Sequence, residues 1–174
     1  MRVRDFDEIR VASRTYARAE ELARDIDGVA VGSFEEAVRG ADVVCTVTNS
    51  SEPVLRHEWL REGAHVNAVG SSIRTARELD SATIAACSLF VDRRESTVNE
   101  AGDYLIPLTE GAISGPEHIR AELGEILTGA HPGRTSAGEL TVFKSLGLAV
   151  EDLAAAEYIV RRAAERGVGT TVEF

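Results

Sequence analysis

The sequence has 174 residues, of which 44% are hydrophobic and 28% charged. A chain of this length and composition is typical of one globular domain with a sizeable core. Its 29 acidic residues outnumber 19 dispersed basic ones, giving a net charge of −10, and this argues against binding to nucleic acid or to an anionic membrane surface.

Nothing in the sequence indicates export, a membrane span or a metal centre. There is no apolar run of about 18 residues and no apolar signal-peptide core near Met1, so we expect a cytoplasmic protein. Cys45 and Cys87 lie in apolar runs, which predicts reduced core cysteines. The four histidines lack the spacing of metal ligands.

Apolar patterning predicts strands alternating with helices along the chain. Short apolar runs predict strands over residues 7–12, 29–31, 43–47, 65–69, 89–91 and 140–143, with a terminal strand over 170–174. Helical spacing predicts helices over residues 16–26, 34–39 and 76–86, helical pieces over 95–108, an amphipathic segment over 118–127 and a long helix over 151–166.

Two local signals support these elements. Ser33 followed by Glu36 is typical of a capping box at a helix start, and residues 53–61 favour a short helical crossover. The last long helix would place Leu153, Ile159 and Val160 on its inner face. The alternation predicts an α/β layered fold with parallel strands.

Polar loops follow two neighbouring predicted strands, and they are the first candidate site. Thr48 and Asn49 follow the run at 43–47, and Gly70 follows the run at 65–69. Ligands in open α/β sheets bind outside the carboxyl ends of the strands. The hydroxyl and amide groups could bond a ribose, a phosphate or a nicotinamide amide, or they could cap the following turns.

Ser13 and Arg14 form a second candidate site between a strand and a helix. In a dinucleotide fold, this position reads the adenosine ribose, where an arginine accommodates a 2′-phosphate. Arg14 therefore favours NADP over NAD, although it could instead be a solvated first-turn residue. Lys144 and Ser145 form a third candidate, as a contact to the nicotinamide end or as a helix-entry loop. The acidic residues Asp80, Asp92, Glu95, Glu100 and Asp103 form no pair at a spacing that acid–base chemistry requires, and we expect most of them to be solvated.

The phosphate loop of a dinucleotide fold is missing from the sequence. A strand, a G-x-G-x-x-G turn and a helix normally precede the strand that ends at Ala12, but only seven residues precede Glu8. The glycines at 111–115 lack the spacing, and those at 167–169 follow a helix. The sequence therefore predicts an incomplete Rossmann-like parallel sheet, with helices on both faces and without its first strand.

Several motifs in order resemble the ornithine cyclodeaminase/mu-crystallin family. The resemblance covers nearly the whole chain, and its motifs are VASRT at 11–15, ADVVCTVT at 41–48, GAHVNAVG at 63–70, RELD at 77–80, EAGD at 100–103, GR at 133–134, TVFKSLG at 141–147 and AVED at 149–152.

The resemblance implies a Rossmann domain inserted into a second domain that binds substrate and dimerises, with NAD or NADP as cofactor. It implies cofactor contacts at matching positions, namely Ser13, Arg14, Thr48, Asn49, Ala68, Val69, Gly70 and Ser145. Residues 1–150 would be a partial NAD(P)-binding domain. Residues 151–174 would return to the substrate domain.

Two departures from the family pattern narrow the expected function. Ser72 stands where cyclodeaminases carry an acidic residue, and a serine is a poor general base, so a reductase or dehydrogenase role is favoured. The substrate domain, with its arginine and lysine, has no counterpart here. The resemblance thus implies the second half of an amino- or imino-acid enzyme, inactive as the isolated chain, with no catalytic residue of its own.

The missing strand would leave unpaired backbone at the sheet centre, where each buried group costs about 1–3 kcal/mol. Either the two half-sheets close directly, or another chain fills the gap, or the sequence is a fragment, which we favour. The alternative function is a non-catalytic α/β module that self-associates or binds a partner chain through exposed edges. We expect a homo-oligomer that binds a small amino- or imino-acid substrate only in the full-length protein.

Overall fold

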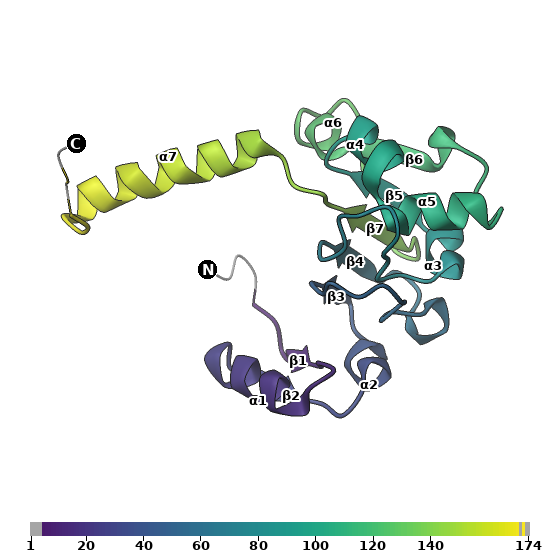
Figure 1. Cartoon of the computed structure of the whole chain (residues 1–174), viewed down its shortest axis with the longest axis horizontal. Coiled ribbons are helices and arrows are strands. Elements are labelled where there is room, and N and C mark those ends of the chain that lie inside the picture. The colour runs from purple at the N-terminus through teal and green to yellow at the C-terminus, as the bar shows by residue number, and fades with distance from the viewer. Residues whose placement is uncertain (1–4, 171, 173–174) are drawn as a thin grey trace.

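The computed structural model describes residues 5–170 and residue 172, and within them all strands pair in parallel. A small sheet contains β1 (Arg10–Val11) and β2 (Val29–Ala30). A five-stranded sheet has the order β3–β4–β7–β5–β6 (Figure 1). Its strands are β3 (Val43–Thr46), β4 (His65–Ala68), β5 (Ser88–Val91), β6 (Ile119–Glu122) and β7 (Thr141–Lys144).

The helices alternate with these strands, so the predicted α/β class is confirmed. They are α1 (Tyr16–Asp25), α2 (Phe34–Val38), α3 (Ser81–Ala86), α4 (Arg94–Glu100), α5 (Gly102–Thr109), α6 (Leu123–Leu127) and α7 (Ala149–Arg166), with 3-10 turns η1 (His57–Trp59) and η2 (Pro116–His118). The Ser33 side chain accepts the Glu36 N–H as predicted. The Glu36 carboxylate accepts the Gly32 N–H, one residue earlier than a capping box requires.

The core lies mainly on one face of the five-stranded sheet. Val44, Val66 and Val142 point to this face from β3, β4 and β7, and they are buried with Ile84 of α3 and Tyr104 of α5. On the opposite face at β5, the Phe90 ring lies edge-on to the His131 ring at 5.9 Å. This face is therefore covered at β5, whereas the side chains that β3 and β4 present to it are exposed or only half-buried.

The last strand, β7, lies between β4 and β5 rather than at an edge. Its residues pair with both neighbours in register, so that Lys144 lies beside Ala68 and beside Val91. This insertion brings the loop after β7 next to the loop after β4, although the two are far apart in the sequence.

The two sheets are not joined by strand pairing among the described residues. β3 pairs only with β4, and β1 pairs only with β2. Two outward-facing valines are exposed here: Val43 in β3 by 42%, and Val47 directly after β3 by 69%. Of the three alternatives for the missing strand, direct closure of the half-sheets is therefore not the arrangement that the structure adopts.

Several local predictions were wrong. Residues 118–127 do not form one amphipathic helix, because β6 occupies the first part and α6 begins only at Leu123. The short helical crossover predicted at 53–61 is confirmed in part, because the segment contains the 3-10 turn η1. Cys45 is exposed, whereas Cys87 is buried, and both are free thiols.

The predicted inner face of α7 is also exposed, because this helix extends away from the sheets (Figure 1). The terminal strand predicted over 170–174 falls largely outside the described residues. Within residues 5–170, no helix combines the length and apolarity that crossing a bilayer requires.

Candidate functional site

The carboxyl ends of β3, β4, β7 and β5 form one continuous edge. The register places Thr46, Ala68, Lys144 and Val91 in one row across the sheet. The loops that begin after this row are held together by backbone bonds, from Val69 N to the Thr46 oxygen at 2.9 Å and from Ser145 N to the Ala68 oxygen at 3.1 Å. Three of the predicted segments, Thr48–Asn49, Ala68–Gly70 and Ser145, therefore meet.

The first loop of this edge leaves the Asn49 side chain free among the described residues. The Thr48 hydroxyl accepts the Ser50 N–H at 3.2 Å, so it caps its own turn, one of the two roles that the sequence allows. Asn49 is exposed, and its amide has no hydrogen bond among the described residues. An amide with both donor and acceptor groups free can bind a carboxamide or a ribose hydroxyl.

Gly70 is required by the close approach of the first loop to the second. A Cβ atom at Gly70 would lie 2.1 Å from both the N and the O of Thr48. The absence of a side chain therefore lets the two loops touch. Val69, the residue before Gly70, is 46% exposed. Ala68, the last residue of β4, is fully buried and lies beneath this edge.

A buried carboxylate holds the loop after β7. Asp92, which follows β5, accepts N–H groups from Leu146 at 2.6 Å and from Gly147 at 2.8 Å, and the Ser145 hydroxyl at 3.2 Å. Asp92 is an exception to the expected solvation of the acidic residues, because it is only 6% exposed. The donors of this tight turn need an acceptor, and the end of the neighbouring strand supplies one.

A second buried carboxylate joins the first two loops. Glu78 is fully buried and accepts the Thr48 N–H at 2.5 Å, the Gly70 N–H at 2.8 Å and the Thr46 hydroxyl at 2.8 Å. Sequence reasoning gave this residue no role. No local signal reveals it, because its partners lie on two other segments of the chain.

A buried ion pair supports Glu78 from behind. Lys144 Nζ lies 3.0 Å from Asp103 Oδ2, and Lys144 also donates to the Ser71 carbonyl. Asp103 Oδ1 accepts the N–H groups of Glu78 and Leu79 at 2.8 and 2.9 Å. Asp103 is fully buried, and it is a second exception to the expected solvation of the acidic residues. Strand period two could have revealed the buried Lys144, since it shares a face with Val142.

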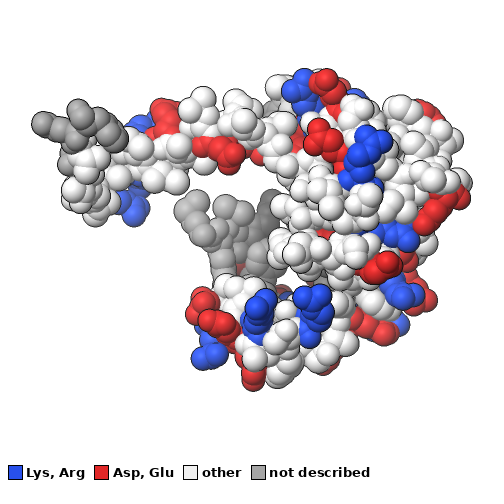
Figure 2. Space-filling view, in the orientation of Figure 1, with Lys and Arg blue, Asp and Glu red and all other residues white. Residues whose placement is uncertain are grey.

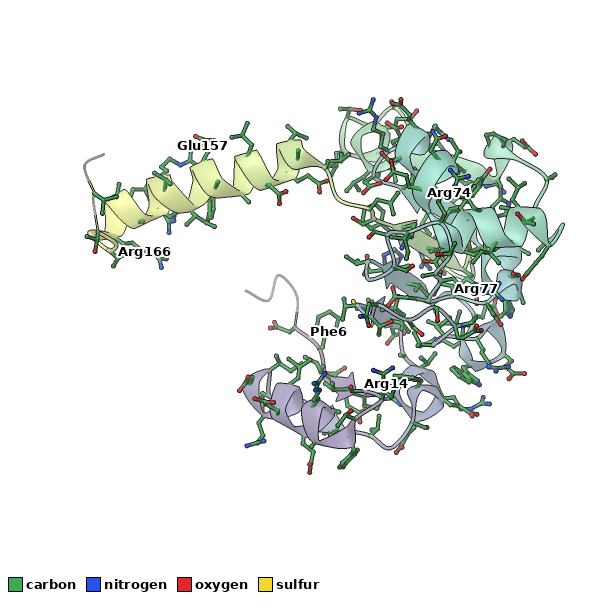
Figure 3. All side chains as sticks on the ribbon, viewed as in Figure 1. Phe6, Arg14, Arg74, Arg77, Glu157 and Arg166 are labelled. Atoms are coloured by element: carbon green, nitrogen blue, oxygen red, sulfur yellow. The ribbon has the colours of Figure 1, made fainter. Side chains whose placement is uncertain are left out.

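Ser13 and Arg14 lie after β1 in the small sheet, and both are exposed. The Ser13 hydroxyl accepts the Thr15 N–H at 3.4 Å. Figure 3 shows Arg14 beside the small sheet, away from the helices of the larger one. No hydrogen bond within the described part of the chain joins these two residues to the Thr48, Gly70 and Ser145 loops, and Arg14 has no ion-pair partner there.

A nicotinamide dinucleotide fits this structure in part. The free Asn49 amide and the exposed strand ends suit the nicotinamide side, and the unpaired Arg14 suits a ribose phosphate. The middle of the cofactor has no counterpart, because no glycine-rich turn opens a helix within residues 5–170. The same residues contain no cluster of side chains suited to a metal ion.

The opposite edge of the sheet carries a hollow lined by residues that include His57, Arg61, Ser88 and Glu139. There the Ser88 hydroxyl and the Thr135 N–H donate to the Glu139 carboxylate and lower its pKa to about 2. These groups tie the start of β5 to the segment before β7. The hollow lies at the amino ends of the strands, where open α/β sheets do not bind their ligands.

Comparison with known proteins identifies the family. A model of the ornithine cyclodeaminase/mu-crystallin family matches residues 1–167. The chain belongs to this family. The resemblance inferred from the sequence motifs is thereby confirmed.

The named relatives include reductases, an alanine dehydrogenase and a probable ornithine cyclodeaminase. The ketimine reductase mu-crystallin of Mus musculus is 47% identical over 156 residues, which cover 88% of this chain and 47% of the relative. The solved Δ1-pyrroline-2-carboxylate reductase of Thermococcus litoralis, in complex with NADH and L-proline, is 41% identical with a TM-score of 0.84, over 94% of this chain and 52% of that one.

An archaeal alanine dehydrogenase dimer with bound NAD is 32% identical with a TM-score of 0.85, and the match covers 99% of this chain and 54% of that one. The chain thus spans about half the length of the relatives that it matches. Those solved relatives bind NADH or NAD.

Proposed function

We propose that this chain is the cofactor-binding portion of an NAD(P)-dependent enzyme that acts on an amino or imino acid. The enzyme would be a ketimine reductase, an amino-acid dehydrogenase or an ornithine cyclodeaminase, and Ser72 favours the first two. The observation that carries the proposal is the shared edge of β3, β4 and β7, from which the loops that contain Asn49, Val69 and Ser145 begin side by side. Membership of a family whose solved members bind NADH or NAD supports it.

In this proposal each predicted site residue contributes to binding the cofactor. The loops at Thr48–Asn49, Ala68–Gly70 and Ser145 hold the nicotinamide side, and Ser13 and Arg14 hold the adenosine ribose. A bound nicotinamide supplies the hydride, whereas the protein binds and orients it. Residues 1–150 form this part, and residues 151–174 lead to a second domain of a homo-oligomer.

The phosphate cradle and the strand between β1 and β3 would come from a further polypeptide segment. β1 and β3 each pair on one side only among the described residues, and a parallel strand between them would satisfy both. Without that segment we expect no turnover and only weak nucleotide binding, with a dissociation constant of about 1 mM or above.

Reduced nicotinamide mononucleotide tests the nicotinamide side directly. Amide NMR spectra recorded during a titration should show saturable shifts at Asn49, Gly70 and Ser145. Asn49→Ala should weaken them, whereas Asn99→Ala, at another exposed asparagine, should not. An absence of shifts at millimolar nucleotide, or shifts confined to the opposite edge, would contradict the proposal.

The adenosine side is tested with adenosine 2′,5′-bisphosphate against 5′-AMP. If Arg14 pairs with a 2′-phosphate, the bisphosphate should bind more tightly, and Arg14→Gln should abolish the difference. Arg18→Gln is the control, because Arg18 is an exposed arginine one turn into α1. Equal dissociation constants of the two nucleotides for the unmodified chain would contradict the proposed preference for NADP.

A second candidate function is a non-catalytic module that self-associates. It is favoured by the apolar side chains of α7 that are exposed, such as Leu153 at 70% and Val160 at 69%. Light scattering separates the two candidates when combined with the nucleotide titration. Stable oligomers without any nucleotide response support the module, whereas a monomer that responds to nucleotide contradicts it.

A further inference from the structure

Three buried acidic residues, Glu78, Asp92 and Asp103, lie behind the proposed site. Taking an ion out of water costs several kcal/mol, and well-packed apolar side chains of similar volume are often as stabilising as a buried pair. Glu78 is nevertheless fully buried beside the apolar core residues Leu55 and Leu79, in a region that also contains the buried Lys144–Asp103 pair. Its charge therefore calls for another explanation.

The Glu78 carboxylate is shared between two loops. One oxygen accepts from Thr48 N, and the other accepts from Gly70 N and from the Thr46 hydroxyl. Thr46 ends β3 and Gly70 follows β4, so a single side chain fixes the spacing between two strand ends. Each bond to a charged acceptor is stronger than one between neutral groups.

The backbone of Glu78 is itself held on both sides. Its N–H donates to Asp103, and its carbonyl accepts the N–H groups of Val54 and Leu55 at 2.8 and 3.0 Å. Asp103 is in turn held by Lys144 of β7. The carboxylate is thus presented from a rigid frame that contains β7 and α5, and a shift of either loop would break bonds to that frame.

We propose that Glu78 is a positioning residue that holds the Thr48 and Gly70 loops in the arrangement in which they receive the nicotinamide. This proposal deepens the proposed function and rests on it. Asp92 holds the third loop in the same way, through Leu146 N and Gly147 N. Glu78 and Asp92 do not contact the ligand in this account, and they act through the loops that they hold.

The test is Glu78→Gln in this chain, read by amide hydrogen exchange and by titration with reduced nicotinamide mononucleotide. The amide of glutamine places a donor where the carboxylate accepted, so it must face either Thr48 N–H or Gly70 N–H. We expect exchange at one or both of these amides to rise at least tenfold, with Val66 and Val142 unchanged, and nucleotide affinity to fall about tenfold, the equivalent of about 1.4 kcal/mol.

Asp92→Asn is the matched control. It should speed exchange at Leu146 and Gly147 and leave Thr48 and Gly70 protected. If Glu78→Gln does not fold, Glu78→Asp keeps the charge but shortens the side chain by one methylene, so it should release at least one of the two loops.

The outcomes separate this proposal from the proposed function. Faster exchange at Thr48 or Gly70 with unchanged nucleotide affinity overturns the positioning role, as does a uniform rise that includes Val66 and Val142. If the unmodified chain shows no nucleotide response, the proposed function fails. In that case the positioning role fails with it, even where the exchange data confirm that Glu78 holds the loops.

Discussion

At the residue scale, the site depends on groups whose partners are distant in the sequence. Glu78, Asp92 and Asp103 each accept bonds from segments other than their own. Their chemistry is visible in the sequence, but their burial is not, because charged residues are normally solvated. The loops that they hold were predictable, since polar residues after a buried strand are a local signal.

The buried pair of Lys144 and Asp103 should contribute strongly to stability. Lys144→Met leaves the Asp103 carboxylate buried and without its cation, and we expect a loss of about 3–5 kcal/mol in the free energy of unfolding. Urea denaturation measures it. Arg162→Met, which breaks the exposed pair with Glu165, should cost no more than about 1 kcal/mol; equal losses would contradict the assigned role.

Gly70→Ala tests the contact between the first two loops. The new Cβ would lie 2.1 Å from backbone atoms of Thr48, which cannot move as a side chain would. Overpacking of this kind costs about 1–3 kcal/mol, and it should also displace the Thr48 amide in NMR spectra. Gly124→Ala is the control, because nothing lies within 4 Å of its added Cβ. A neutral Gly70→Ala would show that the loops are not in contact.

Glu139 should make stability depend on pH in acid. Donation from the Ser88 hydroxyl and the Thr135 N–H lowers its pKa to about 2, below the unfolded value of about 4.3. The folded state therefore gains from the ionised form above about pH 4.3, and this gain is lost as pH falls towards 2. The free energy of unfolding, measured at pH 7, 5, 4 and 3, should fall less steeply with acidification in Glu139→Gln than in the unmodified chain. Glu100→Gln, at an exposed glutamate, should leave this pH dependence unchanged.

At the element scale, most strands and helices could be predicted because each has its own periodic pattern. β3, β4 and α7 match the predicted segments to within two residues. β6 could not be separated from α6 because Ile119, Ala121, Leu123 and Ile126 satisfy both periods over a short window. The place of β7 between β4 and β5 was also hidden, since strand order is set by tertiary packing rather than by local sequence.

Helix α7 was predicted in extent but not in environment. Its apolar stripe includes Leu153 and Val160, which are exposed. The helix projects from the body as an arm (Figure 2). An exposed apolar stripe of this kind marks an association surface. We expect concentration-dependent association in light scattering. Leu153→Glu should reduce this association. Ala154→Glu, towards the opposite side of the helix, should not. Equal effects of the two substitutions would exclude the stripe as the association surface.

At the scale of the whole molecule, two parallel sheets stand apart where a Rossmann order would place one more strand. The sequence predicts this gap because no glycine-rich turn precedes the strand at Arg10. The structure shows each half-sheet with one side unpaired among the described residues. The loops that we propose for the nicotinamide side are, by contrast, already assembled, because they depend on β3, β4 and β7 and on buried carboxylates at the larger sheet.

The central claim is that the chain carries the nicotinamide side of a cofactor site without a phosphate cradle. The most direct test compares the dissociation constants of NADH and reduced nicotinamide mononucleotide, both measured by amide NMR. No carboxylate follows β1 to read a 2′-hydroxyl, so the adenosine half of NADH should add little. We predict shifts at Asn49, Gly70 and Ser145 with both ligands and affinities within about tenfold, or 1.4 kcal/mol. A hundredfold preference for NADH, or no shifts with either ligand, would contradict the account.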